Sequence, residues 1–106
     1  MSNRILKYEI PVSSEFTLQL NQGSRIIKVA VINEKACLWA IAPQESTIIP
    51  VNFSVVMTGE EFELPYTYRY IDTFILCYGE FVGHLFVDTS VPVSYTHLTL
   101  PTNSLV

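Results

Sequence analysis

Histidine, cysteine and acidic side chains are the residues of this 106-residue chain that could act as catalytic groups or metal ligands. The histidines are His84 and His97, and the cysteines are Cys37 and Cys77. Zinc sites need three or four ligands with recognisable local spacing, which these four residues do not show. The sequence also lacks a nucleophile elbow, a Gly-rich phosphate loop and a metalloprotease helix. We therefore expect no metal, no cofactor and no catalytic residues, and hence a protein that is not an enzyme.

His84 is the histidine whose surroundings the sequence indicates. Val82 and Phe86 alternate with it, so all three share one face of an extended strand. The simplest interpretation is a histidine at a sheet face with its hydrogen bonds satisfied inside the protein. Contact with a ligand is a second interpretation, and a catalytic role in a minor hydrolase is a third.

Trp39, the single tryptophan, alternates with Cys37 and Ile41 in another apolar run. A lone tryptophan in such a strand is usually part of the core, and the alternative is a stacking platform in a pocket. Arg25 and Arg69 could each bind a phosphate or carboxylate through two parallel hydrogen bonds, or form ion pairs at the surface. The candidate ligand-binding residues are Trp39, Arg25, Arg69, Tyr70 and His84.

Three tyrosines, Tyr66, Tyr68 and Tyr70, are spaced two residues apart. They would line one face wherever that stretch is extended. Tyrosine suits an interface because it offers both apolar and polar contact, so these three residues are candidates for an interface. An exposed aromatic ladder that stabilises the sheet is the alternative.

The elements that must position these residues are strands, because apolar and polar residues alternate along most of the chain. Gly59–Thr67 carries three glutamates and a proline and is expected to be an irregular loop. We expect one domain, residues 1–92, forming a mainly β, antiparallel small sandwich or strongly bent sheet of about seven strands. The expected strands are 5–12, 16–21, 25–32, 37–42, 47–58, 68–78 and 81–87, with Leu6, Tyr8, Ile10 and Val12 on the core side of the first.

Composition excludes several classes of protein. Apolar residues make up 49% of the chain and charged residues only 15%, with a net charge of −4, which favours a protein that associates with itself. The six basic residues are scattered in sequence, so nucleic-acid binding is not expected. No apolar run approaches the roughly 20 residues of a membrane helix, and no export signal is recognised. Cys37 and Cys77 both fall in apolar runs and are interpreted as buried free thiols, with a cross-strand disulfide as the alternative.

Several short stretches resemble those of a family of short, uncharacterised proteins from tailed bacteriophages and prophages. The most specific are Leu38-Trp39-Ala40 and Tyr70-Ile71-Asp72-Thr73-Phe74, and the likeness extends over about residues 4–88. The chain has Asn21-Gln22-Gly23-Ser24 where such proteins usually have Pro-x-Gly-Ala. The resemblance implies a phage-encoded protein working in the bacterial cytoplasm, and it carries over no catalytic residue.

The end of the chain has a different character. Residues 94–106, beginning Ser94-Tyr95-Thr96-His97, resemble a translated sequencing adapter on a protein from environmental DNA. We expect 93–106 to be a non-native or loosely attached tail, which leaves His97 out of any site.

Three functions remain under consideration. The first is a non-enzymatic binding or assembly module acting as a homo-oligomer. The second is a protein that sequesters a small nucleotide-type signal of the host, with Trp39 or a tyrosine stacking on the base and an arginine meeting the phosphate. The third is a minor hydrolase that uses His84.

Overall fold

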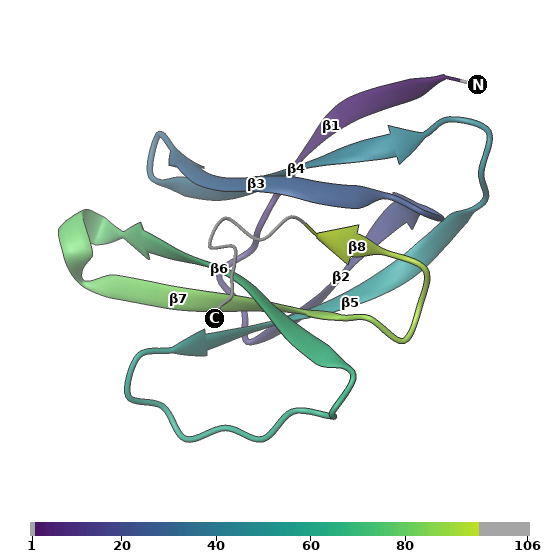
Figure 1. The fold of residues 1–106 in the computed structure, drawn as a ribbon. Coiled ribbons are helices and arrows are strands. Elements are labelled where there is room, and N and C mark those ends of the chain that lie inside the picture. The colour runs from purple at the N-terminus through teal and green to yellow at the C-terminus, as the bar shows by residue number, and fades with distance from the viewer. Residues whose placement is uncertain (1, 96–106) are drawn as a thin grey trace, which may run out of the picture.

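The computed structural model describes residues 2–95, which form two four-stranded sheets packed face to face (Figure 1). His97 and the rest of 96–106 lie outside the described residues. One sheet has the order β1-β4-β3-β8 and the other the order β2-β5-β7-β6. The strands are β1 Asn3–Glu9, β2 Glu15–Asn21, β3 Arg25–Ile32, β4 Lys35–Pro43, β5 Ile48–Met57, β6 Tyr68–Leu76, β7 Phe81–Asp88 and β8 Ser94–Tyr95.

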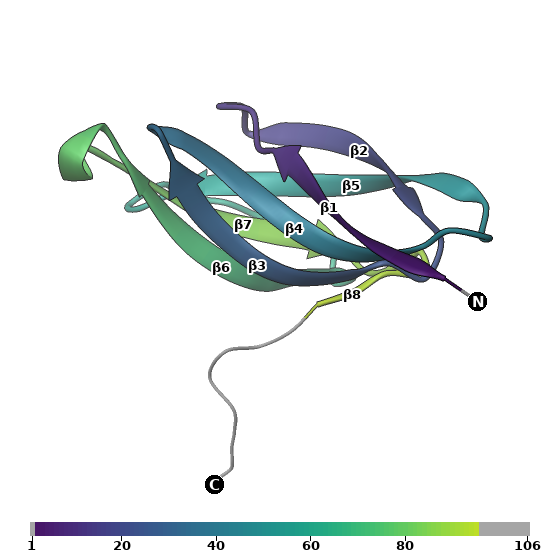
Figure 2. The same cartoon turned by 90° about the horizontal axis from the view of Figure 1, so that it is seen from above.

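The fold class predicted from residue alternation is confirmed, because the structure is a mainly β sandwich with antiparallel pairing almost throughout. Figure 2, seen from above, shows β1, β4 and β3 lying across the layer that contains β5 and β7. The described strands number eight rather than about seven. The additional strand is β8, which pairs parallel with the start of β3, at Ser94 opposite Arg25.

The core lies between the sheets and is built from alternate residues of each strand. In β4 these are alanines and one leucine, and the largest fully buried side chain, Phe53 of β5, stacks on Phe16 of β2 at 5.0 Å between ring centroids. Burial of such side chains is the main stabilising term of the fold. The core residues that are essentially inaccessible to solvent include Leu20, Ile26, Leu38, Val51, Leu85 and Val87.

Two expectations about β4 and β1 need correction. Trp39 does not lie in the core. The inward residues of β4 are Leu38 and the alanines at 36, 40 and 42, and Trp39 is half-buried on the outer face. The first strand ends at Glu9 instead of continuing to residue 12, and Val12 is 72% exposed. Pro11, which has no N–H to donate to a ladder, stands where the chain leaves β1 for the other sheet.

Two hairpin ends meet at one end of the sandwich. Asn33 and Glu34 both have positive φ, 51° and 62°, as a two-residue turn between β3 and β4 requires. The β6–β7 connection, η1 (Cys77–Gly79), also has positive φ at each residue, and its first N–H donates to the Glu34 carboxylate at 3.0 Å. β6 therefore ends before Tyr78, and Cys77 is exposed rather than buried.

The cysteines are both free in the described structure, Cys37 buried and Cys77 at the exposed turn. The interpretation as free thiols is confirmed, although only Cys37 has the predicted burial. Within residues 2–95, no helix has the length and apolar character that a membrane span requires.

Gly83 is the glycine at which the sandwich has no room for a side chain. A Cβ built there would lie 2.7 Å from Cζ of Phe74 and 3.0 Å from Cγ1 of Val55. We predict that Gly83→Ala lowers the free energy of unfolding by about 1 to 3 kcal/mol, the usual effect of overpacking a core. Urea unfolding would measure the effect.

The control for that prediction is the Phe74→Leu variant, alone and combined with Gly83→Ala. If the Phe74 ring causes the clash, the double variant loses less stability than the sum of the two single variants. Additive losses would contradict this explanation.

Candidate binding site

The outer face of the β5-β7-β6 layer carries a polar and aromatic group of side chains. In β7, Gly83 and Leu85 point inward, so His84 and Phe86 point outward. The antiparallel register places Tyr70 of β6 opposite Phe86 and Thr73 opposite His84, with a register shift between the two pairs. Sequence reasoning had placed Tyr70 and His84 in one candidate site, and the structure brings them together.

The irregular connection between β5 and β6 runs over this face. Its first turn is held by hydrogen bonds in both directions: the Met57 N–H donates to the Glu60 carboxylate at 2.9 Å, and the Glu60 N–H donates to the Met57 carbonyl at 3.0 Å. Gly59, with φ of 88°, supplies the left-handed residue of that turn. Phe62, further along, is then placed with its ring 5.6 Å from that of Phe86.

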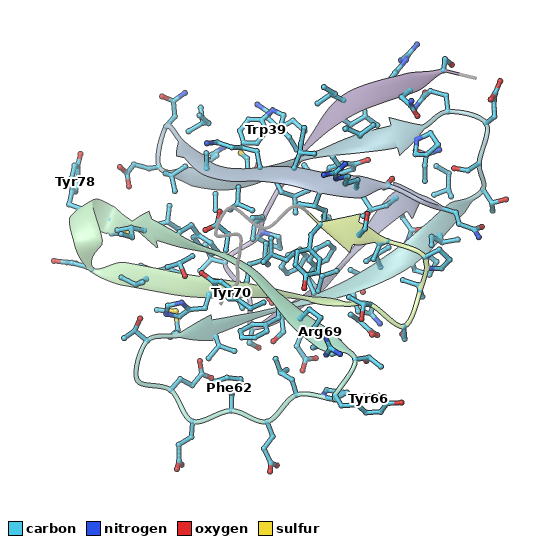
Figure 3. All side chains as sticks on the ribbon, viewed as in Figure 1. Trp39, Phe62, Tyr66, Arg69, Tyr70 and Tyr78 are labelled. Carbon is cyan, nitrogen blue, oxygen red and sulfur yellow. The ribbon has the colours of Figure 1, made fainter. Side chains whose placement is uncertain are left out.

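Together these elements enclose an open pocket of about 310 Å³. Three aromatic rings stand on its walls, since Tyr70 also meets Phe86 edge to face at 5.8 Å. Figure 3 shows Phe62 on the loop outside this layer and Tyr70 on the strand above it. The lining residues are Val56, Met57, Thr58, Gly59, Glu60, Phe62, Tyr70, His84 and Phe86.

His84 is held by hydroxyl groups at both ring nitrogens. Its Nε2 lies 2.8 Å from Oγ1 of Thr58, and its Nδ1 lies 2.9 Å from Oγ1 of Thr73. The Thr73 hydroxyl lies in turn 2.7 Å from the Tyr70 hydroxyl. In neutral histidine one nitrogen donates and the other accepts, so this chain orients the ring. The interpretation of His84 as a histidine satisfied within the protein agrees with this geometry.

Negative charge gathers beside the aromatic pocket. Glu60, Glu61 and Glu63, with Phe62 among them, line a second hollow of about 630 Å³ that shares Glu60 and Phe62 with the first. Neither set of lining residues contains a lysine or an arginine. Within residues 2–95, no group of three or more histidine, cysteine or acidic residues is arranged to hold a metal ion.

Tyr68 and Asp88 form the next outward pair beside Tyr70 and Phe86, on the same outer face. Burial raises the pKa of the Tyr68 hydroxyl, and the charges of Asp88 and Glu15 raise it further. Burial also acts to raise the pKa of Asp88, but the hydrogen bonds that its carboxylate accepts from Ser90 and Thr67 lower it overall. Asp88 therefore stays ionised and adds to the negative charge of this face.

The opposite outer face, that of the β1-β4-β3 layer, carries Trp39 (Figure 3), and the strand register places basic residues around it. Lys7 of β1 and Lys28 of β3 are the residues paired with Trp39 on its two sides, and Arg25 is paired with Ile41, the next outward residue of β4. Paired residues of antiparallel strands point to the same face. Trp39 and Arg25 are thus on one face, and Tyr70 and His84 are on the other.

Arg69 and two of the tyrosines lie outside both groups. The Arg69 guanidinium donates from Nη1 to the carbonyls of Tyr66 and Tyr68, the second at 3.0 Å, which holds the start of its own strand. Tyr66 belongs to the turn before β6 and is 87% exposed, so the three tyrosines do not form one face as predicted. The five candidate ligand-binding residues are divided between two faces, and Arg69 joins neither.

Sequence reasoning missed Phe62, Thr58 and Thr73 as parts of the site. Strand periodicity placed Phe86 on the face of His84, but Phe86 was not counted among the candidate ligand-binding residues. An isolated phenylalanine among glutamates, such as Phe62, was a signal that the loop folds back on the sheet. Thr58 directly follows β5 and Thr73 lies within β6, and only the tertiary structure brings both to one histidine.

We predict that Thr73→Val destabilises the protein by about 1 kcal/mol, because it removes the hydroxyl between Tyr70 and His84. Thr73→Ser, which keeps a hydroxyl, should remain close to wild type. Urea unfolding measures stability, and long-range ¹H–¹⁵N NMR of the imidazole reports the tautomer of His84. Equal stability of the two variants, with unchanged imidazole signals, would contradict the hydrogen-bonded chain.

Comparison with known proteins gives a family and no activity. Neither the curated proteins nor the solved structures contain a match to this chain. The model of one family, described as a domain of unknown function (DUF7352), matches residues 1–96. That range contains all eight described strands, both outer faces and the loop over the aromatic pocket. The chain therefore belongs to the DUF7352 family of domains of unknown function.

Proposed function

We propose that this protein is a non-enzymatic binding module whose aromatic pocket accepts a positively charged group with an apolar surface. The observation that carries the proposal is the pocket itself, which Phe62, Tyr70 and Phe86 line together with Glu60. The adjoining hollow adds two more glutamates, Glu61 and Glu63. Suitable groups are the head of a small organic cation and an arginine or lysine side chain of a partner protein.

The physical reason is the electrostatics of aromatic rings. Their faces are negative and attract cations, and the attraction is larger where the cation loses water. Phe62 is 52% exposed, so part of its ring remains available to a ligand. Glu60, Glu61 and Glu63 add attraction for a cation and repel phosphate, which makes this pocket unsuited to a nucleotide.

The hydrolase hypothesis is less well supported by the same geometry. A histidine base in nucleophilic catalysis is usually oriented by a carboxylate, which stabilises the imidazolium that forms. At His84 the group hydrogen-bonded to Nδ1 is the neutral hydroxyl of Thr73. The arrangement suits a histidine that shapes the pocket wall rather than one that transfers protons.

The sequence resemblance supports a biological setting for the proposal, that of a phage-encoded protein working in the bacterial cytoplasm. We propose further that the protein works as a homo-oligomer, so that its partners include further copies of itself. The low share of charged residues, 15%, supports self-association, because few charged groups are available to cover the surface of a small monomer.

Choline and its neutral isostere 3,3-dimethylbutan-1-ol provide the test of the pocket. We predict that choline binds at least about twofold more tightly, since cation–π attraction contributes roughly 0.5 to 2 kcal/mol. NMR titration would measure both affinities, with a short acetylated arginine peptide added to distinguish a side chain from a free cation. Equal affinity for choline and the isostere would remove the basis for cation recognition.

Two variants of the same loop locate the binding. Phe62→Ala should weaken choline binding severalfold, whereas Tyr66→Ala, which removes an exposed aromatic ring outside the pocket, should not change it. Binding that survives Phe62→Ala would show that the cation sits elsewhere.

The second candidate function, capture of a nucleotide-type host signal, is favoured by the opposite face. There Trp39 offers a ring for stacking, with Lys7 and Lys28 on either side to meet phosphate. Arg69, the other arginine suggested from the sequence, donates hydrogen bonds to the carbonyls of Tyr66 and Tyr68.

Trp39 is the single tryptophan, so fluorescence excited at wavelengths where tyrosine does not absorb reports this face alone. If the second candidate is correct, cyclic and ADP-ribose-like nucleotides quench the fluorescence, and Lys28→Gln weakens binding more than Lys35→Gln does. Lys35 is the matched control because it lies at the far end of β4. Unchanged fluorescence at millimolar nucleotide would exclude stacking on Trp39.

A further inference from the structure

One edge of the sandwich is formed by β1 alone. β1 is the end strand of its sheet and packs along β4, with no comparable contact to any other described strand. Figures 1 and 2 show it extending along the border of the molecule toward the N-terminus. An end strand of this length presents a row of backbone groups to which another strand can add.

The hydrogen bonds to β4 show which residues face that open edge. The Ile10 N–H donates to the Ala36 carbonyl at 2.8 Å, and the Gln44 N–H donates to the Ser2 carbonyl at 3.1 Å. In antiparallel pairing the bonded positions alternate, so the even-numbered residues of β1 bond to β4. The N–H and C=O groups of the odd-numbered residues, Asn3, Ile5, Lys7 and Glu9, point away from β4.

The side chains of β1 also suit an additional neighbour. Ile5 is 63% exposed on the outer face, and Leu6 and Tyr8 are only half-buried on the inner face. Within β1 there is neither a proline nor a register shift against β4 to obstruct pairing. These features differ from those with which proteins usually block an edge strand, apart from the charges of Arg4, Lys7 and Glu9.

We propose that a second copy of the chain pairs its β1 antiparallel to this edge, about a twofold axis at Leu6. This inference rests on the homo-oligomer part of the proposed function and gives it an interface. In this register Leu6 meets Leu6 of the second copy, Ile5 meets Lys7, Arg4 meets Tyr8, and Asn3 meets Glu9. All the odd-numbered residues of both strands then exchange backbone hydrogen bonds.

The two neighbouring registers, with the twofold axis at Lys7 or at Ile5, are less favourable than the register centred on Leu6. An axis at Lys7 would set two ammonium groups directly opposite each other, which is destabilising. An axis at Ile5 would pair only residues 3–7 of the two β1 strands with each other, which shortens the paired segment. The charge of Lys7, which obstructs the first register, is tolerated in the Leu6 register because its opposite residue is apolar.

Pairing of this kind would join the β1-β4-β3-β8 sheets of the two copies into one continuous sheet. A twofold axis perpendicular to the sheet keeps both outer faces on the same side, so the two Trp39 faces become one surface with a Lys7 from each copy near its centre. The aromatic pockets lie on the other layer and stay open. The cation binding proposed above is thus independent of the dimer.

Single cysteines at Ile5, Leu6 and Lys7, each in a Cys77→Ser background, test the register. Opposite residues of a non-hydrogen-bonded pair are about 4.5 Å apart at Cα, within disulfide reach, whereas residues offset by two positions are beyond about 7 Å. Mild oxidation should therefore cross-link Leu6→Cys and leave Ile5→Cys and Lys7→Cys mostly monomeric on non-reducing gels. Equal cross-linking of all three variants would overturn the register.

A charge pair at Ile5 tests the interface without cysteines. Ile5→Lys places like charges opposite Lys7 of the second copy, so it should weaken the dimer at least about fivefold in light scattering, whereas Ile5→Glu should retain or tighten it. Ile5 is exposed, which makes both variants compatible with the monomer fold. A wild-type monomer at millimolar concentration overturns both the interface and the homo-oligomer, while an oligomer indifferent to both variants overturns the interface alone.

Choline titration of the same variants separates this inference from the pocket. Ile5→Lys should bind choline as the wild type does. Loss of the dimer with normal choline binding supports the β1 interface, and choline binding that falls with the dimer contradicts the independence of the two sites.

Discussion

The pleat of the β-strand is the constraint on which the rest of this structure depends. Because successive side chains point to opposite faces, each strand supplies one set of residues to the core and another to an outer surface. In β4 the division separates Leu38 from Trp39, and in β7 it separates Leu85 from His84. The same alternation that builds the core therefore builds both candidate binding surfaces.

The two outer faces have opposite electrostatic character, although the chain as a whole is only moderately acidic. Strand order places Lys7 and Lys28 on either side of Trp39, while the loop after β5 brings its glutamates to the other layer. Each face has aromatic surface that an organic cation or a nucleotide base could contact. Charge, rather than aromatic content, is what distinguishes the ligands proposed for the two faces.

The aromatic pocket shows how a small sandwich can make a shaped site without a deep cleft. The sheet contributes a flat surface with Phe86 and His84, and the loop closes one side through Phe62. Hydroxyls from Thr58 and Thr73 fix the imidazole between them. This arrangement gives the pocket a defined wall, and preorganised walls lower the entropic cost of binding.

The sequence by itself predicted seven of the strands and a mainly β domain, either a sandwich or a strongly bent sheet, because period-two alternation and β-branched runs are local signals. It indicated from Val82, His84 and Phe86 that they share a face. It could not decide that Trp39 faces outward, because both sets of residues in β4 are apolar and either could have been the core. Nor could it separate Arg25 from Tyr70 or join Thr58 to His84. Those relations depend on strand order and register, which are set by pairings between residues far apart in the chain.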